Sequence, residues 1–432
     1  MLLKNLGKNM NNKEKEILLK KRYSAEKRFR FFGISSIILA LLFLCILLIN
    51  IFTNGLSAFS RTEILLKINF NEKKIGINPS STDKEIKQAN FDEILQEALL
   101  SLAPDVQELK QAELIDLVSI DATSEIKKFF LKNRDVLNKT AEVALTLSDD
   151  LDQVHKGNFP RNIPEDRRRF SDFQLKIYDE QNAKNKIISE FNWPFIFNAD
   201  SREPEIAGVG ASLSGSFFTL IVCLILSFPL GILAAIYLEE FAPKNKITEI
   251  IEVNVNNLAA VPSIVFGLLG LGIFLNYFYL PRSTPLVGGL VLALMTLPRI
   301  IIPCRAALKA VPPSIREGAL ALGASKVQTV MHNVVPLAMP GTLSGTIIGL
   351  SQALGETAPL LLIGMVAFIN VVPSSPFDPS AVLPVQVYLW SESAERGFVE
   401  KTSATIIILI FFLAFMNSFA IYLRNKFEKK WS

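Results

Sequence analysis

Long apolar runs alternate with polar stretches along this chain of 432 residues. The first run, Phe31–Phe52, is long enough to cross a bilayer as a helix, which takes roughly 20 residues. A long polar stretch follows, and then five more apolar runs, at about Leu213–Leu238, Leu258–Leu280, Pro285–Cys304, Thr342–Ile369 and Thr405–Leu423. The pattern predicts an all-α integral membrane protein with six transmembrane helices and one large polar domain.

The same pattern divides the chain into five parts. We expect a solvated, disordered cytoplasmic tail (1–30), a first transmembrane helix (31–53), an extracytoplasmic domain (54–203), a membrane core (204–425) and a short cytoplasmic tail (426–432). Basic residues before the first run and after the last one place both termini in the cytoplasm. A cleavable signal peptide is the rival interpretation of the first run, but its apolar region would be shorter, about 7–15 residues.

The polar domain carries helix-like spacing of apolar residues, most clearly between Ile86 and Leu102. Asp83 is placed to cap the first of these helices, and Pro104 interrupts the pattern. We therefore expect a mainly helical domain.

Composition excludes several kinds of function. The three cysteines lie in or beside apolar runs without metal-ligand spacing, and the two histidines stand apart. No phosphate-binding loop is present, so another chain must bind any ATP that is used. The basic residues cluster beside apolar runs, which argues against nucleic-acid binding. We predict neither a catalytic residue nor a metal site.

The fifth apolar run carries small and polar residues at helical spacing. On an ideal helix six of them share an arc of about 80°, namely Gly341, Gly345, Gly349, Gln352, Glu356 and Pro359. Leucine and isoleucine occupy the opposite side. We expect the three glycines to let a neighbouring helix approach closely.

Glu356 is the ionisable residue of this face. A charge at membrane depth is costly, so its carboxyl should face protein or water. It is either a packed structural group or part of a pathway or gate. We favour the second, acting through a cation on a neighbouring helix or through hydrogen bonds that hold the gate. Snorkelling to the membrane interface explains Arg299, near the cytoplasmic end of the fourth run.

The cytoplasmic segment 310–336 predicts two short helices joined by a glycine. Ser314 and Glu317 have the spacing of a capping box, which predicts a helix start. Gly323 can end that helix in a left-handed conformation. Ser325 can cap a second helix that stops before Pro336.

This segment resembles the EAA loop of ATP-binding-cassette (ABC) importer permeases. Four residues match its signature, namely Glu317, Ala319, Gly323 and Pro336. Three depart from it, namely Gly318, Asn333 and Val335. The resemblance implies that an ATPase docks on residues Glu317, Gly318, Ala319, Gly323 and Pro336.

Neighbouring segments resemble the phosphate-specific permeases of this superfamily. The matching stretches are 204–220, 237–243, 260–271 and 354–364, with Glu-Thr-Ala-Pro at 356–359 as the most telling. The resemblance covers roughly 204–425 and implies a core of the MetI-like kind. It also implies a translocation pathway or gate at Gln352, Glu356, Thr357 and Pro359. The first span and the polar domain resemble an N-terminal extension found in one branch of these permeases.

One departure concerns the charge of the pathway. Some members carry an arginine four residues before the glutamate, where this chain has Gln352. Glutamine donates hydrogen bonds but brings no positive charge. Attraction of an anion must then come from elsewhere, such as a partner permease or helix N-termini.

The resemblance implies a multi-pass subunit of a bacterial inner membrane that works with other chains. The implied partners are a second related permease, an ATPase dimer that binds ATP and magnesium, an extracytoplasmic phosphate-binding protein, phosphate and membrane lipid. Two alternatives stay open. One is a permease for another anion such as molybdate or sulfate, and the other is a membrane receptor with an outer sensor domain.

Overall fold

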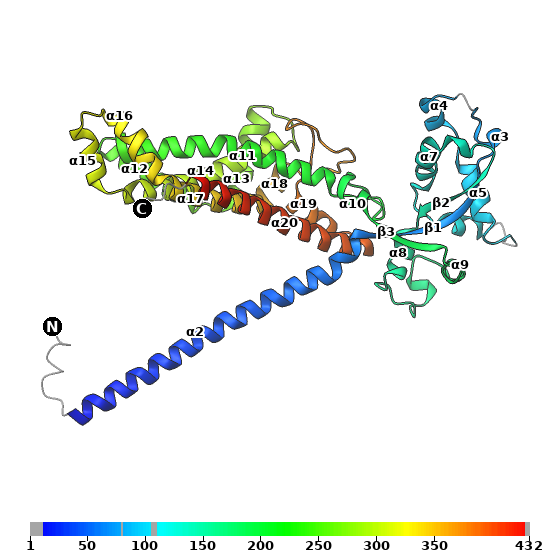
Figure 1. The fold of residues 1–432 in the computed structure, drawn as a ribbon, viewed down its shortest axis with the longest axis horizontal. Coiled ribbons are helices and arrows are strands. Elements are labelled where there is room, and N and C mark those ends of the chain that lie inside the picture. Colours follow the sequence, from blue (N-terminus) through cyan, green and yellow to red (C-terminus); the bar gives the residue numbers. More distant parts are fainter. Residues whose placement is uncertain (1–11, 79–80, 105–109, 428–432) are drawn as a thin grey trace. The chain divides into compact units, whose positions relative to one another are not determined.

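The computed structural model describes residues 12–78, 81–104 and 110–427 (Figure 1). It separates into two compact units, residues 1–53 and 54–432. The described residues of the first unit belong to one long helix, α2 (Asn12–Gly55). The predicted disordered tail was therefore wrong over residues 12–30, and residues 1–11 lie outside the described part. Ion pairs one turn apart support the charged segment, with 3.4 Å between Glu16 and Lys20 and 2.6 Å between Glu26 and Arg30.

The second unit opens with a short 3₁₀ turn, η1 (Leu56–Phe59), and a sheet that the sequence analysis missed. The central strand β1 (Ser60–Asn69) pairs antiparallel with β2 (Thr140–Thr146) and β3 (Ile187–Phe191). On β1, Ile64, Leu66 and Ile68 alternate with more exposed residues, the period of a half-buried strand. The polar domain (residues 54–203) is thus mainly helical, as predicted, but it also contains a three-stranded sheet.

Short helices cover this sheet and share its core. They are α3 (Glu72–Ile75), α4 (Asp83–Gln88), α5 (Asp92–Leu100), α6 (Gln111–Ile115), α7 (Ala122–Lys132), η3 (Arg134–Val136), α8 (Asp149–His155), η4 (Glu165–Arg167) and α9 (Asp172–Ala183). The core holds stacked aromatic rings, with 5.6 Å between the centroids of Phe70 and Phe130. Thr82, rather than Asp83, caps α4 through a capping box with Glu85.

The helical bundle (residues 204–427) follows the short helix α10 (Trp193–Phe197). Its elements are α11 (Gly210–Ile236), the π-helical turn η5 (Tyr237–Phe241), α12 (Lys246–Ala259), α13 (Ser263–Gly270), the π-helical turn η6 (Leu271–Tyr277), α14 (Pro285–Ala310), α15 (Pro313–Ala321), α16 (Lys326–Thr329), the π-helical turn η7 (Val330–Val334), α17 (Val335–Leu354), α18 (Ala358–Leu362), α19 (Leu383–Ser391) and α20 (Arg396–Phe427). Helix α14 packs against α11 and α17, and α17 packs against α20.

Within the described part of the chain, five helices are long and apolar enough to cross a membrane, or six if one bent pair counts as a single span. The bent pair replaces the predicted third span. Helices α12 and α13–η6 meet at 102°, because Pro262 lacks an amide donor and its ring disfavours a helical conformation for the residue before it. Most of the predicted span, about 258–280, is therefore helical as α13–η6, but the prediction missed the bend before Ser263.

The fifth predicted span also differs from the structure, at both of its ends. The apolar helix runs from Lys326 to Leu354, so it passes through Pro336 instead of stopping before it. Pro336 has no backbone N–H to donate to the preceding turn. The π-helical turn η7, directly before α17, changes the backbone hydrogen-bond pattern at this point. The helix then breaks at Gly355, because the ring of Pro359 would clash with the Gly355 carbonyl in a continuous helix.

A buried cluster of charges joins the polar domain to the first turns of α20. We call it the domain joint, and its members are Asp152, Lys156, Glu400 and Lys401. Lys156 Nζ lies 2.7 Å from Asp152 and 2.8 Å from Glu400. The side chains of Lys156 and Glu400 are 7% and 5% exposed. Lys401 donates to the carbonyl of Ala207 at 2.6 Å. Each charge of the joint therefore has a close partner.

Candidate functional sites

The first candidate site is the exposed connection between α14 and α17. Helix α15 ends in a Schellman motif: Gly323 has φ +88°, its amide donates to Leu320, and the amide of Ala324 donates to Ala319. This confirms that Gly323 ends the helix in a left-handed conformation. A side chain at Gly323 would meet no atom within 4 Å but would be strained by the backbone angle.

The start of α15 differs from the prediction. The helix begins at Pro313 after Pro312, so Ser314 and Glu317 do not form the predicted capping box. Proline suits the first helical turn, because its missing amide would have no partner there. The second predicted cap is confirmed, since Ser325 forms a capping box with Gln328 at the start of α16.

The predicted docking residues do not all share one environment. Glu317, Gly318 and Gly323 are exposed, Ala319 is half-buried, and Pro336 lies within the helix that starts at α16. Large apolar side chains stand out into solvent beside them. Their exposed fractions are 49% for Leu320, 91% for Leu322, 57% for Val327 and 48% for Met331. Apolar groups exposed together in this way are typical of a protein-docking surface.

An ion-pair cluster holds this connection to the end of α11, and the sequence analysis missed it. We call it the loop latch, and its members are Glu239, Glu240, Arg305 and Arg316. Arg316 Nη2 lies 2.6 Å from Glu240 Oε1, and its Nε also donates to that carboxylate at 3.2 Å. The same guanidinium donates to the carbonyls of Leu308 and Val311 at the end of α14. Arg316 therefore fastens α15 to two helices at once.

The second half of the loop latch links η5, the turn that continues α11, with α14 and α12. Arg305 Nη2 lies 3.3 Å from Glu239 and 2.7 Å from Glu252. A sequence signal for these ion pairs was present in the segment YLEEFAP, which holds Glu239 and Glu240. Carboxylates at the end of an apolar run need cationic partners, so the segment indicated that two cations lie nearby.

The glycines of α17 face α14. A Cβ at Gly345 would lie 2.3 Å from the ring of Pro303, and one at Gly341 would lie 2.7 Å from Ala307. At Gly349 the nearest atom would be 3.3 Å away, in the side chain of Thr296. The two backbones therefore approach so closely that a side chain at Gly345 would have to displace α14.

Glu356 meets a cation on α14. Its carboxylate lies 3.8 Å from Arg299, and the two side chains are 19% and 21% exposed. Nη1 of Arg299 is buried and has no hydrogen-bond partner among the described residues. The snorkelling interpretation of Arg299 was wrong, because its guanidinium lies beside Glu356. A guanidinium with a free donor inside a bundle is suited to an oxyanion.

The single polar arc predicted for 341–362 does not form. Because α17 ends at Leu354, Glu356 lies in the break, whereas Gln352 is in the last turn of α17 and is exposed. Thr357 precedes α18, and the buried Pro359 packs against α13, where a Cβ at Gly267 would lie 2.7 Å from it. The break thus separates residues that a continuous helix would align.

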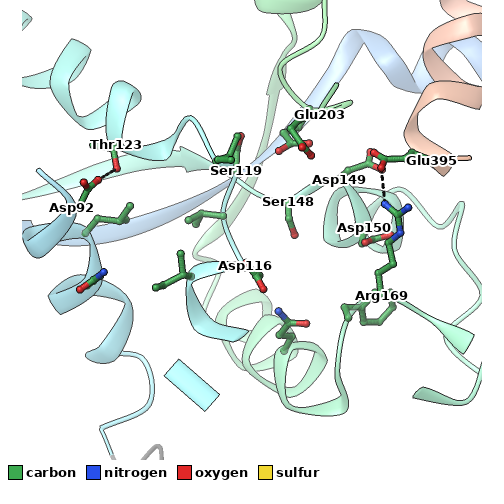
Figure 2. A pocket seen from close by; sticks show the side chains of 18 residues that line it. Asp92, Asp116, Ser119, Thr123, Ser148, Asp149, Asp150, Arg169, Glu203 and Glu395 are labelled. Carbon is green, nitrogen blue, oxygen red and sulfur yellow. Dashed lines mark hydrogen bonds and ion pairs between the residues drawn. The ribbon is translucent and has the colours of Figure 1, made fainter. Parts of the chain in front are cut away.

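A cavity of about 540 Å³ lies in the polar domain (Figure 2). Seven of the residues that line it are Asp or Glu and one is basic, Arg169, which pairs with Glu395 at 2.9 Å. Burial, together with the nearby charges of Glu205 and Asp150, raises the pKa of Asp149 to about 7. An anion would be repelled here, so the cavity is not suited to an oxyanion.

The described residues contain no group of three or more His, Cys, Asp or Glu that could hold a metal ion. Cys45, Cys223 and Cys304 are free thiols.

Comparison with known proteins agrees with this arrangement. Residues 227–432 match the family described as "binding-protein-dependent transport system inner membrane component", and residues 16–165 match a domain of unknown function, DUF3333. The phosphate transport system permease protein PstA of Mycobacterium leprae is 31% identical over 229 residues, which is 52% of this chain and 73% of that protein. The chain belongs to the family of ABC importer permeases.

Two further relatives extend the comparison. The "Probable ABC transporter permease protein YqgH" of Bacillus subtilis is 30% identical over 50% of this chain and 70% of its own length. The inward-facing methionine ABC transporter MetNI is 17% identical, with a TM-score of 0.40, over 51% of this chain and 95% of that one.

Membership of this family places the chain among multi-pass membrane proteins. Such permease subunits are not enzymes, because ATP hydrolysis belongs to a partner ATPase, and they work with a substrate-binding protein. A membrane receptor, one of the alternatives left open by the sequence, is not a member of this family.

Proposed function

We propose that this permease carries inorganic phosphate across the membrane. The observation that carries the proposal is Arg299, a partly exposed side chain whose buried Nη1 lies beside Glu356 and has no hydrogen-bond partner among the described residues. The name of the M. leprae relative, a phosphate transport permease, supports the same substrate.

Arg299 supplies the positive charge that Gln352 lacks. It lies on α14, where Gly349 of α17 leaves room for its side chain, since a Cβ there would be 3.5 Å from the Cβ of Arg299. The free donor Nη1 is the atom that faces Glu356 Oε1, at a distance beyond hydrogen-bond reach, so a passing oxyanion can take this donor. Because the pair is 3.8 Å apart, it is loose enough for an anion to compete for the arginine.

Glu356 favours phosphate over sulfate or molybdate. At neutral pH phosphate still carries a proton on oxygen and can donate a hydrogen bond to a carboxylate, whereas sulfate and molybdate are fully deprotonated. A site with a buried acceptor discriminates strongly against an analogue that cannot donate to it. Glu356 beside Arg299 therefore offers the two groups that a protonated oxyanion needs.

The exposed connection between α14 and α17 is the proposed docking site for the ATPase. Leu320, Leu322 and Val327 supply apolar contact, and Glu317 supplies charge. Movement of α15 passes through Arg316 to Glu240 at the end of α11, and so reaches the helices around Arg299. The chain itself needs no cofactor, because the ATPase dimer binds ATP and magnesium.

The proposal includes the arrangement in the membrane. Basic residues place the two termini and the docking site in the cytoplasm of a bacterial inner membrane. The polar domain then lies outside, where a phosphate-binding protein delivers its substrate. A second related permease completes the pathway.

Uptake by variants of Arg299 tests the substrate. In a strain that lacks its own phosphate importers, Arg299→Gln should lower phosphate uptake at least about tenfold, because a charged hydrogen bond is lost. Arg299→Lys should keep part of the uptake, since it retains the charge without the planar donor set. Radioactive phosphate, sulfate and molybdate are compared in the same cells.

Arg424→Gln is the matched control, because Arg424 donates to Ser344 at the far end of α17 from Glu356. It should leave uptake unchanged. Sulfate or molybdate uptake without phosphate uptake would overturn the proposed substrate. Normal phosphate uptake by Arg299→Gln, at a normal amount of assembled complex, would remove Arg299 from the pathway.

A further inference from the structure

Three large aromatic side chains of the polar domain stand out from its surface. Phe191 is 45% exposed, Trp193 60% and Phe197 66%. They contact one another, with ring centroids 4.6 Å apart between Phe191 and Trp193 and 6.0 Å apart between Trp193 and Phe197. We call these three residues the aromatic patch.

Hydrogen bonds fix the position of the patch, one to the turn that follows the end of the first apolar span and one to the beginning of the next span. The amide of Asn192 donates to Phe59 at 2.8 Å, in the short turn η1 that directly follows α2. On the other side, the amide of Gly210, the first residue of α11, donates to the carbonyl of Asn198 at 2.8 Å. The patch therefore lies where the chain leaves one apolar span and enters the next.

The exposure is a property of the local sequence and not of poor packing. Phe195, in the middle of α10, is fully buried and lies 5.6 Å from the ring of Phe59 and 6.5 Å from that of Trp390. The same five-residue helix thus turns one aromatic ring inward and holds Trp193 and Phe197 outward. Aromatic side chains bury about 150–250 Å² each when covered, so leaving the patch in water is unfavourable.

We infer that the aromatic patch sits in the headgroup region of the lipid bilayer and seats the polar domain on the membrane surface. Tryptophan is enriched at this level because its ring is apolar and its indole N–H is polar. The indole of Trp193 makes no hydrogen bond within the described part of the chain, which leaves its N–H free for water or a lipid carbonyl. Exposed polar residues border the patch, Glu190 on one side and Asn198 on the other.

Helix α11, whose first residue donates to Asn198 beside the patch, also carries exposed apolar side chains. Phe217 and Ile225 of that helix are 47% and 64% exposed, as expected for a helix that faces lipid. A lipid interface therefore covers the patch without any further partner. The inference does not depend on phosphate being the substrate.

Fluorescence of Trp193 tests the inference in the full chain. Trp390→Phe with Trp431→Phe leaves Trp193 as the single tryptophan, and the protein is placed in bilayers whose lipids carry bromine at a known depth. Trp193 should lose most of its emission when bromine lies near the headgroups and less when it lies near the bilayer centre. The control retains only Trp390, which is 4% exposed, and should be quenched less by either lipid.

Two outcomes overturn the inference. Quenching of Trp193 by aqueous iodide, with no quenching by brominated lipid, would place the patch in water. Lipid quenching that disappears once the second permease and the ATPase are assembled would show that a protein covers the patch.

A second measurement serves if the tryptophan variants do not fold. The native cysteines Cys45, Cys223 and Cys304 are first replaced by serine. A spin label is then attached to the cysteine that Phe197→Cys introduces. The label should be more accessible to oxygen, which concentrates in lipid, than to a water-soluble nickel reagent. The reverse order would also overturn the inference.

Discussion

Ion pairs fasten the helical bundle at both ends, but the two clusters are built differently. In the domain joint, Lys156 and Glu400 are 7% and 5% exposed. In the loop latch, Arg316 and Glu240 are 23% and 9% exposed, and Arg305 and Glu239 are 16% and 14% exposed. Separating a buried pair leaves an uncompensated charge in a medium of low dielectric constant, whereas a partly exposed pair can exchange its partner for water. The domain joint is therefore suited to a permanent connection and the loop latch to one that moves.

Removing one charge of the domain joint should have the largest effect on stability. Glu400→Ala removes one of the two carboxylates that pair with the buried Lys156 and also removes the acceptor of Gln153, which donates to Glu400 at 2.8 Å. We expect a loss of roughly 3–5 kcal/mol, the usual cost of breaking a buried pair. Thermal unfolding of the full chain in nanodiscs, followed by the fluorescence of Trp390, measures it.

Arg169→Ala is the matched control for this change. Arg169 also joins the polar domain to the start of α20, through Glu395, but it is 61% exposed. Its loss should cost at most about 1 kcal/mol. Equal effects of the two changes would mean that burial does not distinguish the domain joint.

A smaller effect should follow from pH at Asp149, which accepts a hydrogen bond from Gly397 of α20 at 3.2 Å. Its pKa is raised from 3.8 to about 7, mainly by burial and also by nearby Glu205, Asp150 and Asp152, while Lys401 opposes the shift. Between these two pKa values the folded state holds a proton that the unfolded state has lost. Stability should therefore fall as pH rises through this window, by up to about 1.4 kcal/mol per pH unit.

Asp149→Asn removes this titration. As pH rises from 5 to about 7, the unfolding temperature of the variant should increase relative to that of the wild type. Parallel curves for the two proteins would show that Asp149 does not titrate in this range.

The smallest change in stability, with the clearest change in function, is expected at the loop latch. Arg316→Lys keeps the charge but loses the two-pronged contact with Glu240, so the cost should be about 1 kcal/mol. Uptake should fall while the partner's ATP hydrolysis continues, because α15 no longer moves α11. ATPase rate and uptake are measured in the same proteoliposomes.

Lys309→Gln is a control in the same region, since Lys309 is 72% exposed and lies 3.9 Å from Glu239. It should change neither rate. If Arg316→Lys lowers ATP hydrolysis and uptake equally, the loop latch serves docking rather than transmission.

Much of the bundle could be predicted from the sequence, because long apolar runs and a left-handed glycine are local signals. The apolar runs around α2, α11, α14 and α20 and the helix end at Gly323 were confirmed. The breaks at Pro262 and Gly355 were missed, because hydropathy averages over a proline that interrupts a helix. The strands were missed as well, although EILLKI in β1 has the alternation of a strand.

The candidate site was only half predictable. Glu356 stood out because a lone carboxylate in an apolar run needs a partner. Its partner Arg299 is 57 positions earlier in the chain, and no local pattern links the two. The same holds for Glu240 and Arg316, whose pairing depends on how α11 and α14 pack.

The antiparallel pairing of β1 with β3 means that the polar domain is a removable insert. Ser60 and Phe191 are partners on adjacent strands, so the chain enters and leaves the domain at neighbouring positions. Directly opposite residues in such a pair are only about 5 Å apart, a gap that a two-residue hairpin spans. Replacing the 130 residues between them, 61–190, with such a turn would leave α2 and α11 connected as before. The architecture thus permits relatives of this permease to gain or lose the whole domain by a single splice.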